Sequence, residues 1–289
     1  MRAKLPYFDL ILEDRSFGGD AGGTFDRFVH WGFWEQPASA TGTREDFLSA
    51  MARLNSVVLD AADLDSGQRI LDVGCGFGGT LSVIDRCFDC VRLTGINIDR
   101  RQLEVVQASV RPSPGNTIHF VAGDACRLPF PDASFDRVIA VESAFHFPSR
   151  QLFLSEAARV IKENGKLALS DFVPQAANSG PIGRWLQNRL EPAYGSVEVA
   201  WPKGRYWKLG ERTGLSCFMD RDITRQTLPT YPYIKKLWRR TGDLEASRAL
   251  VRATMILQWL SRLGVVRYRV LAFRRTHASG AKAVPKRCH

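Results

Sequence analysis

Apolar positions follow two different periods along the chain. Between residues 44 and 59 they recur every three or four positions, which predicts an amphipathic helix. From residue 68 onward, short apolar runs alternate with helical segments, and the runs read RILDV, VRLTGIN, TIHFVAG, FDRVIAV and KLALSDF. We expect helices from Gly79, from Arg100 and over residues 150–162 between these runs. Such alternation is typical of βαβ units that form a mainly parallel sheet.

The alternation breaks after residue 173. Residues 174–208 are rich in Pro, Gly and aromatic side chains, which predicts an insertion above the carboxyl edge of the sheet. CFMDRDITRQ and VVRYRVLAFRR alternate like strands, with a helical pattern over residues 243–263 between them. We therefore predict an α/β fold, a Rossmann-like doubly wound sheet of seven mainly parallel strands, with an N-terminal helical cap and a lid insertion after strand five.

Five segments follow from this pattern. They are a helical cap, a cofactor-binding Rossmann-like core, a lid insertion, the final strands and helix of the core, and a basic tail, over residues 1–60, 61–173, 174–208, 209–275 and 276–289.

Composition narrows the class of protein. With 289 residues, 45% of them hydrophobic and 24% charged, the chain can bury a full core, which excludes a disordered tail or a disulfide mini-protein. No run approaches ~18 apolar residues, and the N-terminus turns acidic before a signal core forms, so we expect a cytoplasmic protein without a membrane span. The six cysteines are scattered and predict reduced thiols, and Cys87 and Cys90 lack the second pair that a zinc site needs, so no metal is predicted.

Charge is unevenly distributed. The formal net charge is +10, and residues 200–289 hold 20 of the 40 lysines and arginines but only 5 of the 30 acidic residues. This asymmetry suggests an anionic partner, either nucleic acid, a membrane surface or an anionic substrate, although a solvated basic face would look the same. Because no RNA-binding module is recognisable, nucleic acid is the least favoured of these partners.

A glycine-rich loop follows the first strand of the core. In LDVGCGFGG, Gly74, Gly76 and Gly78 permit a tight turn and a close approach of the backbone to a ligand. The same loop also satisfies the G-x-G-x-x-G pattern of dinucleotide binders, so by itself it does not identify the ligand.

Polar residues at three later positions favour one ligand. Asp72, two residues before the loop, suits a cationic group. Asn97 ends the second strand and Gln102 follows one helical turn later, so both can reach ribose hydroxyls. Asp124, next to Ala125 after the third strand, can accept a hydrogen bond from an adenine amino group.

These segments resemble the class I S-adenosylmethionine-dependent methyltransferases. The motifs LDVGCGFGG, GINIDRRQ, GDACRLPFPDASFD and ARVIKENGKLALSDF stand in the family's order between Arg69 and Phe172. The resemblance implies that S-adenosylmethionine is the cofactor, that the three loop glycines line its methionine and ribose, and that Asp124 binds its adenine. Two positions depart from the family pattern: Asn97 replaces an acidic residue, and residues 163–165 read Glu-Asn-Gly instead of Pro-Gly-Gly.

The candidate bases follow the fourth and fifth strands. His146 and Asp171 resemble the pair in natural-product sugar O-methyltransferases of the rebeccamycin type, and sarcosine, dimethylglycine and tocopherol methyltransferases are similar over the same region. The resemblance implies that either residue is a base, and an imidazole with a pKa near ~6.5 suits that role. Glu142 is expected to orient His146 or to bind the cofactor. A pocket-shaping role for His146 and a helix-capping or turn role for Asp171 are the alternatives.

Aromatic residues gather in two regions. The segment FDRFVHWGFW resembles the N-terminal cap of several small-molecule methyltransferases, which implies that Trp31 lies over the cofactor, where its ring attracts the sulfonium. A hydrophobic seam between cap and core is the alternative. A bulky, apolar acceptor is predicted from an aromatic lid formed by Phe33, Trp34, Trp185, Tyr194, Trp201 and Tyr206.

The sequence thus predicts a methyltransferase that acts on a bulky, apolar small molecule of secondary metabolism, by in-line transfer with base assistance. The alternative acceptor is a carbon of an isoprenoid diphosphate, methylated with or without cyclisation, for which the basic last third would bind the phosphates. An RNA methyltransferase and an NAD-dependent oxidoreductase are less favoured. The oligomeric state is not predicted.

Overall fold

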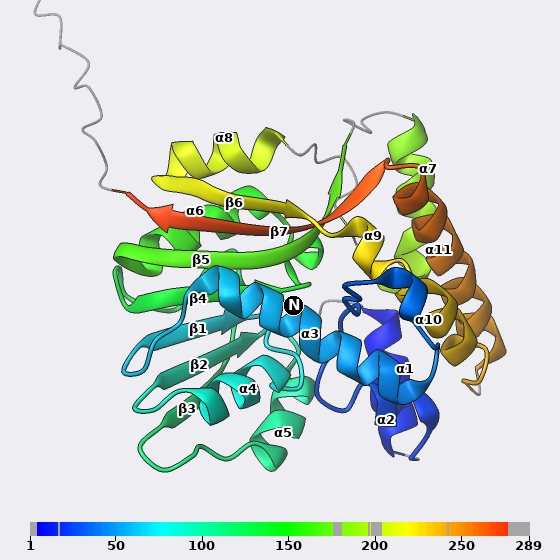
Figure 1. Ribbon diagram of the computed structural model, residues 1–289, viewed down its shortest axis with the longest axis horizontal. Coiled ribbons are helices and arrows are strands. Elements are labelled where there is room, and N and C mark those ends of the chain that lie inside the picture. Colours follow the sequence, from blue (N-terminus) through cyan, green and yellow to red (C-terminus); the bar gives the residue numbers. More distant parts are fainter. Residues whose placement is uncertain are drawn as a thin grey trace, which may run out of the picture.

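A seven-stranded sheet forms the centre of the protein. The computed structural model describes residues 5–16, 18–175, 181–195, 197, 204–241 and 243–276. The strands lie in the order β3-β2-β1-β4-β5-β7-β6, and β7 runs opposite to the other six strands (Figure 1). Their bounds are β1 (Arg69–Val73), β2 (Arg92–Asn97), β3 (Thr117–Ala122), β4 (Phe135–Val141), β5 (Ile161–Pro174), β6 (Leu215–Asp222) and β7 (Val266–Arg275). The predicted fold class is confirmed. The strand order reverses between β1 and β4, where open α/β sheets bind ligands.

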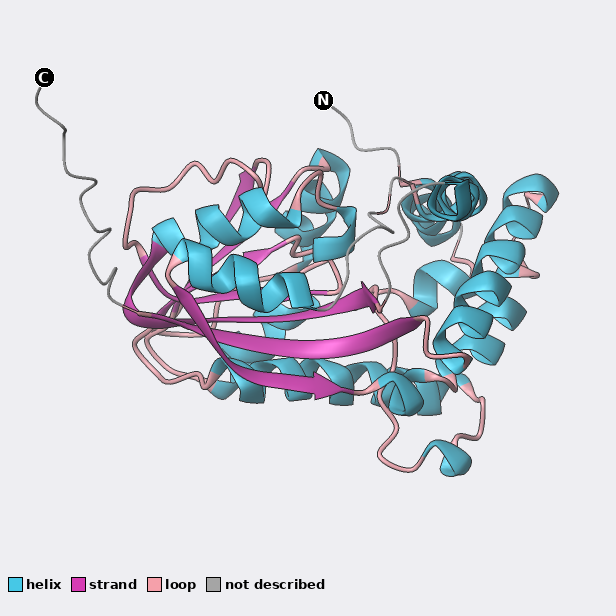
Figure 2. Cartoon of the chain, turned by 90° about the horizontal axis from the view of Figure 1, so that it is seen from above, coloured by secondary structure: helices cyan, strands magenta, loops and turns pink. Residues whose placement is uncertain are grey.

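Helices cover both faces of the sheet (Figure 2). One face is covered by α3 (Arg44–Ala62), α4 (Gly79–Cys87) and α5 (Arg100–Ser109). The other is covered by α6 (Arg150–Val160) and α8 (Gly204–Thr213). This two-sided burial explains why the parallel strands read as nearly continuous apolar runs.

A third group of helices lies beyond the carboxyl ends of β1, β2 and β4, at the right of Figure 1. It contains α1 (Pro6–Ser16), α2 (Asp20–Thr24), α7 (Pro181–Tyr194), α9 (Thr224–Thr227), α10 (Thr230–Trp238) and α11 (Leu244–Arg262). Helix α7 packs against α1 and α11, and α10 packs against α11. We call this group the helical cap. It differs from the cap predicted over residues 1–60, because α3 packs on the sheet and because α7 and α10 pack beside α1 and α2. It joins the N-terminal segment to parts of the chain about two hundred residues later.

The segment predicted as a lid divides between two layers. Helix α7 belongs to the helical cap, but α8 packs on β6 and α6, where Tyr206 and Leu209 are buried in the sheet core. The reason is the amphipathic pattern of α8, which gives it an apolar face that the sheet can bury.

Side-chain caps set the helix limits. Thr43 accepts a hydrogen bond from the Asp46 N–H at the start of α3, and Asp243 accepts from two N–H groups at the start of α11. Helix α3 continues three residues beyond the predicted end and stops at Asp63, which is left-handed. In the described ranges, no helix is long and apolar enough to cross a bilayer.

Candidate functional site

The glycine loop between β1 and α4 opens a cavity of about 1020 Å³ at the carboxyl edge of the sheet. Gly74 and Gly76 have φ of 79° and 54°, and both line it. A Cβ on Gly74 would lie 2.5 Å from the Cβ of Ser143, so a side chain would collide there. Gly78 is not among the lining residues. Its added Cβ would lie 2.3 Å from a methyl of Val106, so this glycine lets α4 pack against α5.

The polar side chains predicted for the cofactor meet in this cavity. Asp72, Asn97, Gln102, Asp124 and Ala125 all line it. The Asn97 side-chain amide donates to Oε1 of Gln102 at 3.0 Å, and the Asp124 carboxylate accepts from the Cys126 N–H at 2.8 Å. These bonds hold the side chains in fixed orientations without a ligand.

The surroundings of Asp72 favour a cationic ligand group. It is buried, and burial raises its pKa to about 7. Its Oδ2 has no hydrogen-bond partner among the described residues. Leaving a buried polar atom without a partner costs about 1–3 kcal/mol, and an ammonium group would remove that penalty. The cavity therefore fits the amino-acid end of S-adenosylmethionine.

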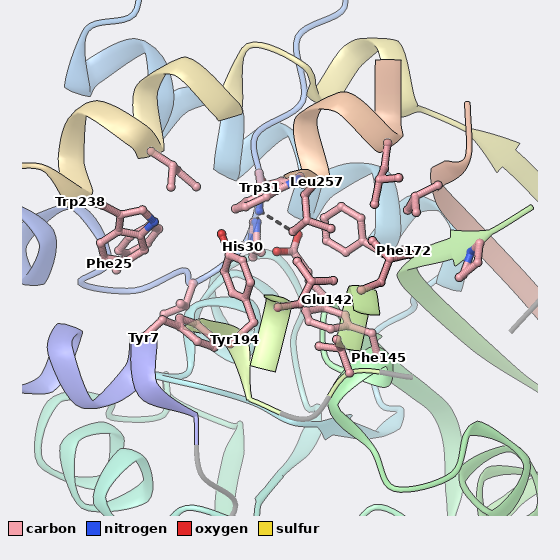
Figure 3. A pocket seen from close by; sticks show the side chains of 18 of the residues that line it. Tyr7, Phe25, His30, Trp31, Glu142, Phe145, Phe172, Tyr194, Trp238 and Leu257 are labelled. Carbon is pink, nitrogen blue, oxygen red and sulfur yellow. Dashed lines mark hydrogen bonds between the residues drawn. The ribbon is translucent and has the colours of Figure 1, made fainter. Parts of the chain in front are cut away.

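A second cavity, of about 880 Å³, lies between the sheet and the helical cap (Figure 3). In this view, Phe25 and Trp238 lie at one end, Phe145 and Phe172 at the other, and His30, Trp31 and Glu142 between them. Further apolar lining comes from α7, α10 and α11 through Leu186, Leu190, Tyr194, Ile234, Leu257 and Leu260.

Four of the described residues line both cavities: Tyr7, Val29, His30 and Glu142. We call them the shared wall. Within the described part of the chain, this is where a group held in one cavity can meet a group held in the other, so the shared wall marks the candidate site of group transfer.

Glu142 occupies the shared wall in a strained conformation. Its φ of 48° places a non-glycine residue in the left-handed region, which is typical of functional sites. Its Oε2 accepts hydrogen bonds from the Trp31 N–H at 2.8 Å and from the Tyr268 hydroxyl at 2.5 Å. The other carboxyl oxygen is directed toward the interior of the cavity in Figure 3. Burial raises the pKa of Glu142 to about 8, so the group is mostly protonated at neutral pH.

His146 reaches the shared wall through a tyrosine. It ends a short 3-10 turn (Ala144–His146) after β4 and lines the first cavity. Its Nε2 lies 3.0 Å from the hydroxyl oxygen of Tyr7, which lines both cavities. Sequence reasoning missed Tyr7 because it precedes His146 by 139 positions, and nothing near it in the chain marks it.

His30 is a second residue that sequence reasoning missed, although its neighbour Trp31 was singled out. Its Nδ1 lies 2.8 Å from the backbone oxygen of Trp31, so Nδ1 carries the proton and Nε2 a lone pair. Nε2 is buried, and no described residue bonds to it. Burial lowers the pKa of His30 to about 4, which keeps the ring neutral at physiological pH.

Asp171 lies in a buried ion pair and lines neither cavity. Its Oδ2 accepts from Nε of Arg150 at 2.7 Å and from the hydroxyl of Tyr206. The carboxylate is thus neutralised within the protein, and Tyr206 helps to hold it. Neither residue lines a cavity, where the predicted roles of a base and of a lid residue would place them.

The remaining predicted aromatics separate in space. Trp31 lines the second cavity rather than the first, and so does Tyr194. Phe33 and Trp34 line neither, since Phe33 lies under the guanidinium of Arg221 and the Trp34 ring nitrogen donates to Asp46 at 3.0 Å. Trp185 is 51% exposed, and Trp201 lies outside the described residues.

Comparisons with known proteins agree with this geometry. A family model described as "Methyltransferase domain" matches residues 71–169. "Methyltransferase GfsG" of Streptomyces halstedii is 32% identical over 71% of this chain and 72% of that protein. An "O-methyltransferase" of Pyrenophora dematioidea is 31% identical over 83% and 86%. A geranyl diphosphate C-methyltransferase from Streptomyces coelicolor, solved with Mg²⁺, geranyl diphosphate and S-adenosyl-L-homocysteine, shares the fold, with a TM-score of 0.71, 15% identity and coverage of 96% and 100%.

Proposed function

The chain belongs to the class I S-adenosylmethionine-dependent methyltransferases, and from this premise we propose that it methylates a hydroxyl of a bulky, apolar small molecule of secondary metabolism. The shared wall carries the proposal, because it joins a polar cavity that contains the cofactor motifs to an apolar, aromatic-lined one. One of the quoted relatives is named an O-methyltransferase, which supports transfer to oxygen.

The first cavity would hold the cofactor. When bound, S-adenosylmethionine supplies a methyl group activated by a positively charged sulfur. Asp72 would pair with its ammonium group, Asn97 and Gln102 would bond to its ribose, and Asp124 would accept from its adenine amino group.

The shared wall would remove the acceptor's proton. The proton of the acceptor hydroxyl passes to the Tyr7 oxygen while the Tyr7 proton passes to Nε2 of His146, so the positive charge ends on the imidazole. Burial raises the pKa of Tyr7 well above its usual value, so Tyr7 stays protonated at rest and acts only as a relay. In this proposal His146 keeps its predicted role as base but acts through Tyr7.

The charges around the second cavity favour a neutral acceptor. Of its described lining residues, Arg150 is the one lysine or arginine, and Asp171 pairs with it. A diphosphate would have to compete with that carboxylate for the guanidinium. The isoprenoid alternative therefore needs a rearrangement that a neutral polyketide or phenol does not.

We also propose that the enzyme works in the cytoplasm. The five cysteines that the structure describes are free thiols, which agrees with a reducing compartment.

The proposal is tested in two steps with the intact chain. Calorimetric titration should show binding of S-adenosylhomocysteine and none of NADH. The protein is then incubated with S-adenosylmethionine and, separately, with polyphenols, polyketide alcohols, geranyl diphosphate and a short RNA, and products are detected by mass spectrometry. A methyl group gained on a hydroxyl supports the proposal. A methyl group gained only on a carbon of geranyl diphosphate, or only on RNA, overturns it.

A further inference from the structure

The outer side of α11 exposes large apolar side chains at helical spacing. Met255, Trp259 and Leu263 are 43%, 60% and 71% exposed, and they follow one another every four residues around the end of the helix. Arg248, Arg252 and Arg262 are exposed at positions that fall on the same side. We call these six residues the α11 outer face.

The inner side of the same helix faces the second cavity, which we call the acceptor cavity. Leu257 and Leu260 line it, and Leu250 and Ala253 are buried beneath. The helix therefore carries apolar side chains on two sides, and no other part of the described chain covers the outer one. An exposed apolar patch bordered by charge is typical of a surface that binds a partner.

Positive charge surrounds this face. Residues 230–263 contain seven lysines and arginines against two acidic residues. None of the three arginines of the α11 outer face forms an ion pair with a described carboxylate. On α10, the pKa of Lys235 is lowered by burial and then by the positive charges of Arg239 and Arg262, which shows that these cations crowd together. An anionic partner would relieve this repulsion.

The neighbouring helix repeats the combination of tryptophan and arginine. Helix α7 packs beside α11 at the right edge of Figure 1. Its Trp185 is 51% exposed, and the guanidinium of Arg189 lies 5.6 Å from the centre of its ring. A second exposed pair of an aromatic and a cationic side chain therefore lies on the helix next to α11.

We propose that the α11 outer face docks on the surface of an anionic lipid bilayer. Arginines attract acidic headgroups, while tryptophan and leucine side chains enter the boundary between headgroups and acyl chains. A nucleic-acid phosphate backbone would use the arginines but would leave Trp259 and Leu263 in water. A second copy of this chain would bring the same positive charges face to face.

Such docking gives the cavity behind α11 a source of acceptor. An apolar molecule concentrates in a bilayer, and the helix that would touch the bilayer also supplies Leu257 and Leu260 to the cavity wall. This delivery role rests on the proposed function, but the docking itself does not.

Vesicle co-sedimentation of the full chain tests the docking without any turnover. We expect binding to phosphatidylcholine vesicles that contain phosphatidylglycerol, weak binding to phosphatidylcholine alone, and release by high salt. Replacing Arg248 and Arg252 by Gln should lower the partition coefficient about fivefold per residue. Replacing Trp259 and Leu263 together by Gln should lower it at least tenfold.

Matched controls use exposed residues elsewhere. Arg92→Gln at the start of β2 and Leu152→Gln on α6, which is 53% exposed, should bind vesicles like the unmodified protein. Titration with S-adenosylhomocysteine reports the cofactor site separately, so a failure of docking and a failure of the methyltransferase proposal give different results. Equal partitioning of all variants, salt-sensitive binding of RNA but not of vesicles, or a dimer that the Trp259 and Leu263 changes dissociate would each overturn the inference.

Discussion

The two cavities that meet at the shared wall are built in opposite ways. The first cavity, which we call the cofactor cavity, takes most of its polar lining from the ends of β1 and β2, from the segments that follow β3 and β4, and from α4 and α5, within residues 72–148. The acceptor cavity takes its lining from residues spread between 7 and 266, which include the loop at residues 29–31, the ends of β5 and β7, and the helices α1, α7, α10 and α11. The first is a local product of strand ends and the second a product of long-range packing.

This difference has a physical consequence. Loop glycines and strand-end carboxylates are held by a rigid parallel sheet, so a substitution in the cofactor cavity changes one contact without moving the others. The acceptor cavity can change shape when cap helices shift, because its walls are side chains of separate helices. We expect cofactor recognition to be rigid and acceptor recognition to be adaptable.

The largest expected effect lies where the two regions touch. Tyr7→Phe removes the hydroxyl that connects the acceptor cavity to His146, and we expect kcat to fall about 10²–10⁴-fold. Affinity for S-adenosylhomocysteine should stay within about twofold, since packing of the ring is unchanged. Tyr194→Phe is the matched control: its hydroxyl bonds to Thr254 at 2.7 Å and should matter little for turnover. If both variants lose turnover equally, the Tyr7 relay is excluded.

A substitution in the buried ion pair of Asp171 and Arg150 should affect the stability of the fold more than the rate of methyl transfer. Asp171→Asn leaves the guanidinium of Arg150 without its charge partner, and we expect the free energy of unfolding to fall by about 3–5 kcal/mol. The kcat of the folded fraction should change only a few-fold, because Asp171 lines neither cavity. Urea unfolding and single-turnover rates on the same sample measure the two effects. Asp63→Asn, which removes an ion pair at a carboxylate that is 67% exposed, should shift unfolding by less than about 1 kcal/mol. A kcat loss as large as that of Tyr7→Phe would restore Asp171 as the base.

The contrast between the two cavities also explains how much of the fold and of the site the sequence could predict. Strand periodicity and the ordered motifs predicted the seven-stranded sheet, because each strand signal is local. They also placed Asp72, Asn97 and Asp124 at one edge, since parallel strands end together. The acceptor cavity was harder to predict from the sequence. An aromatic residue gives the same sequence pattern whether it lines a cavity, as Tyr194 does, or holds a buried ion pair, as Tyr206 does. Only tertiary packing separates these cases.

The cofactor cavity offers a smaller, pH-dependent effect. Asp72→Asn should weaken binding of S-adenosylhomocysteine about tenfold at pH 8, since a hydrogen bond to a charged group contributes about 1.5–3 kcal/mol. With a pKa of about 7, Asp72 of the unmodified protein becomes neutral as the pH falls through 7, so affinity should fall with it, whereas the Asn variant should not follow. Asp124→Asn, in the same cavity, should weaken binding but keep the pH profile. Identical profiles for the unmodified protein and Asp72→Asn would exclude an ion pair with the ligand.

The smallest expected effect concerns Glu142, which lies in the shared wall between the two cavities. Folding raises the pKa of Glu142 from 4.5 to about 8. Between these pH values the folded state binds more protons than the unfolded state, so the folded state loses stability as the pH rises from 4.5 to about 8. Glu142→Gln keeps an oxygen that accepts from the Trp31 N–H and the Tyr268 hydroxyl but removes this titration. The variant should therefore melt a few degrees above the unmodified protein at pH 8, and the difference should vanish near pH 4.5. A constant difference across this range would mean that the carboxyl group is not buried from solvent at the shared wall, and that the two cavities meet in water rather than in a dry site.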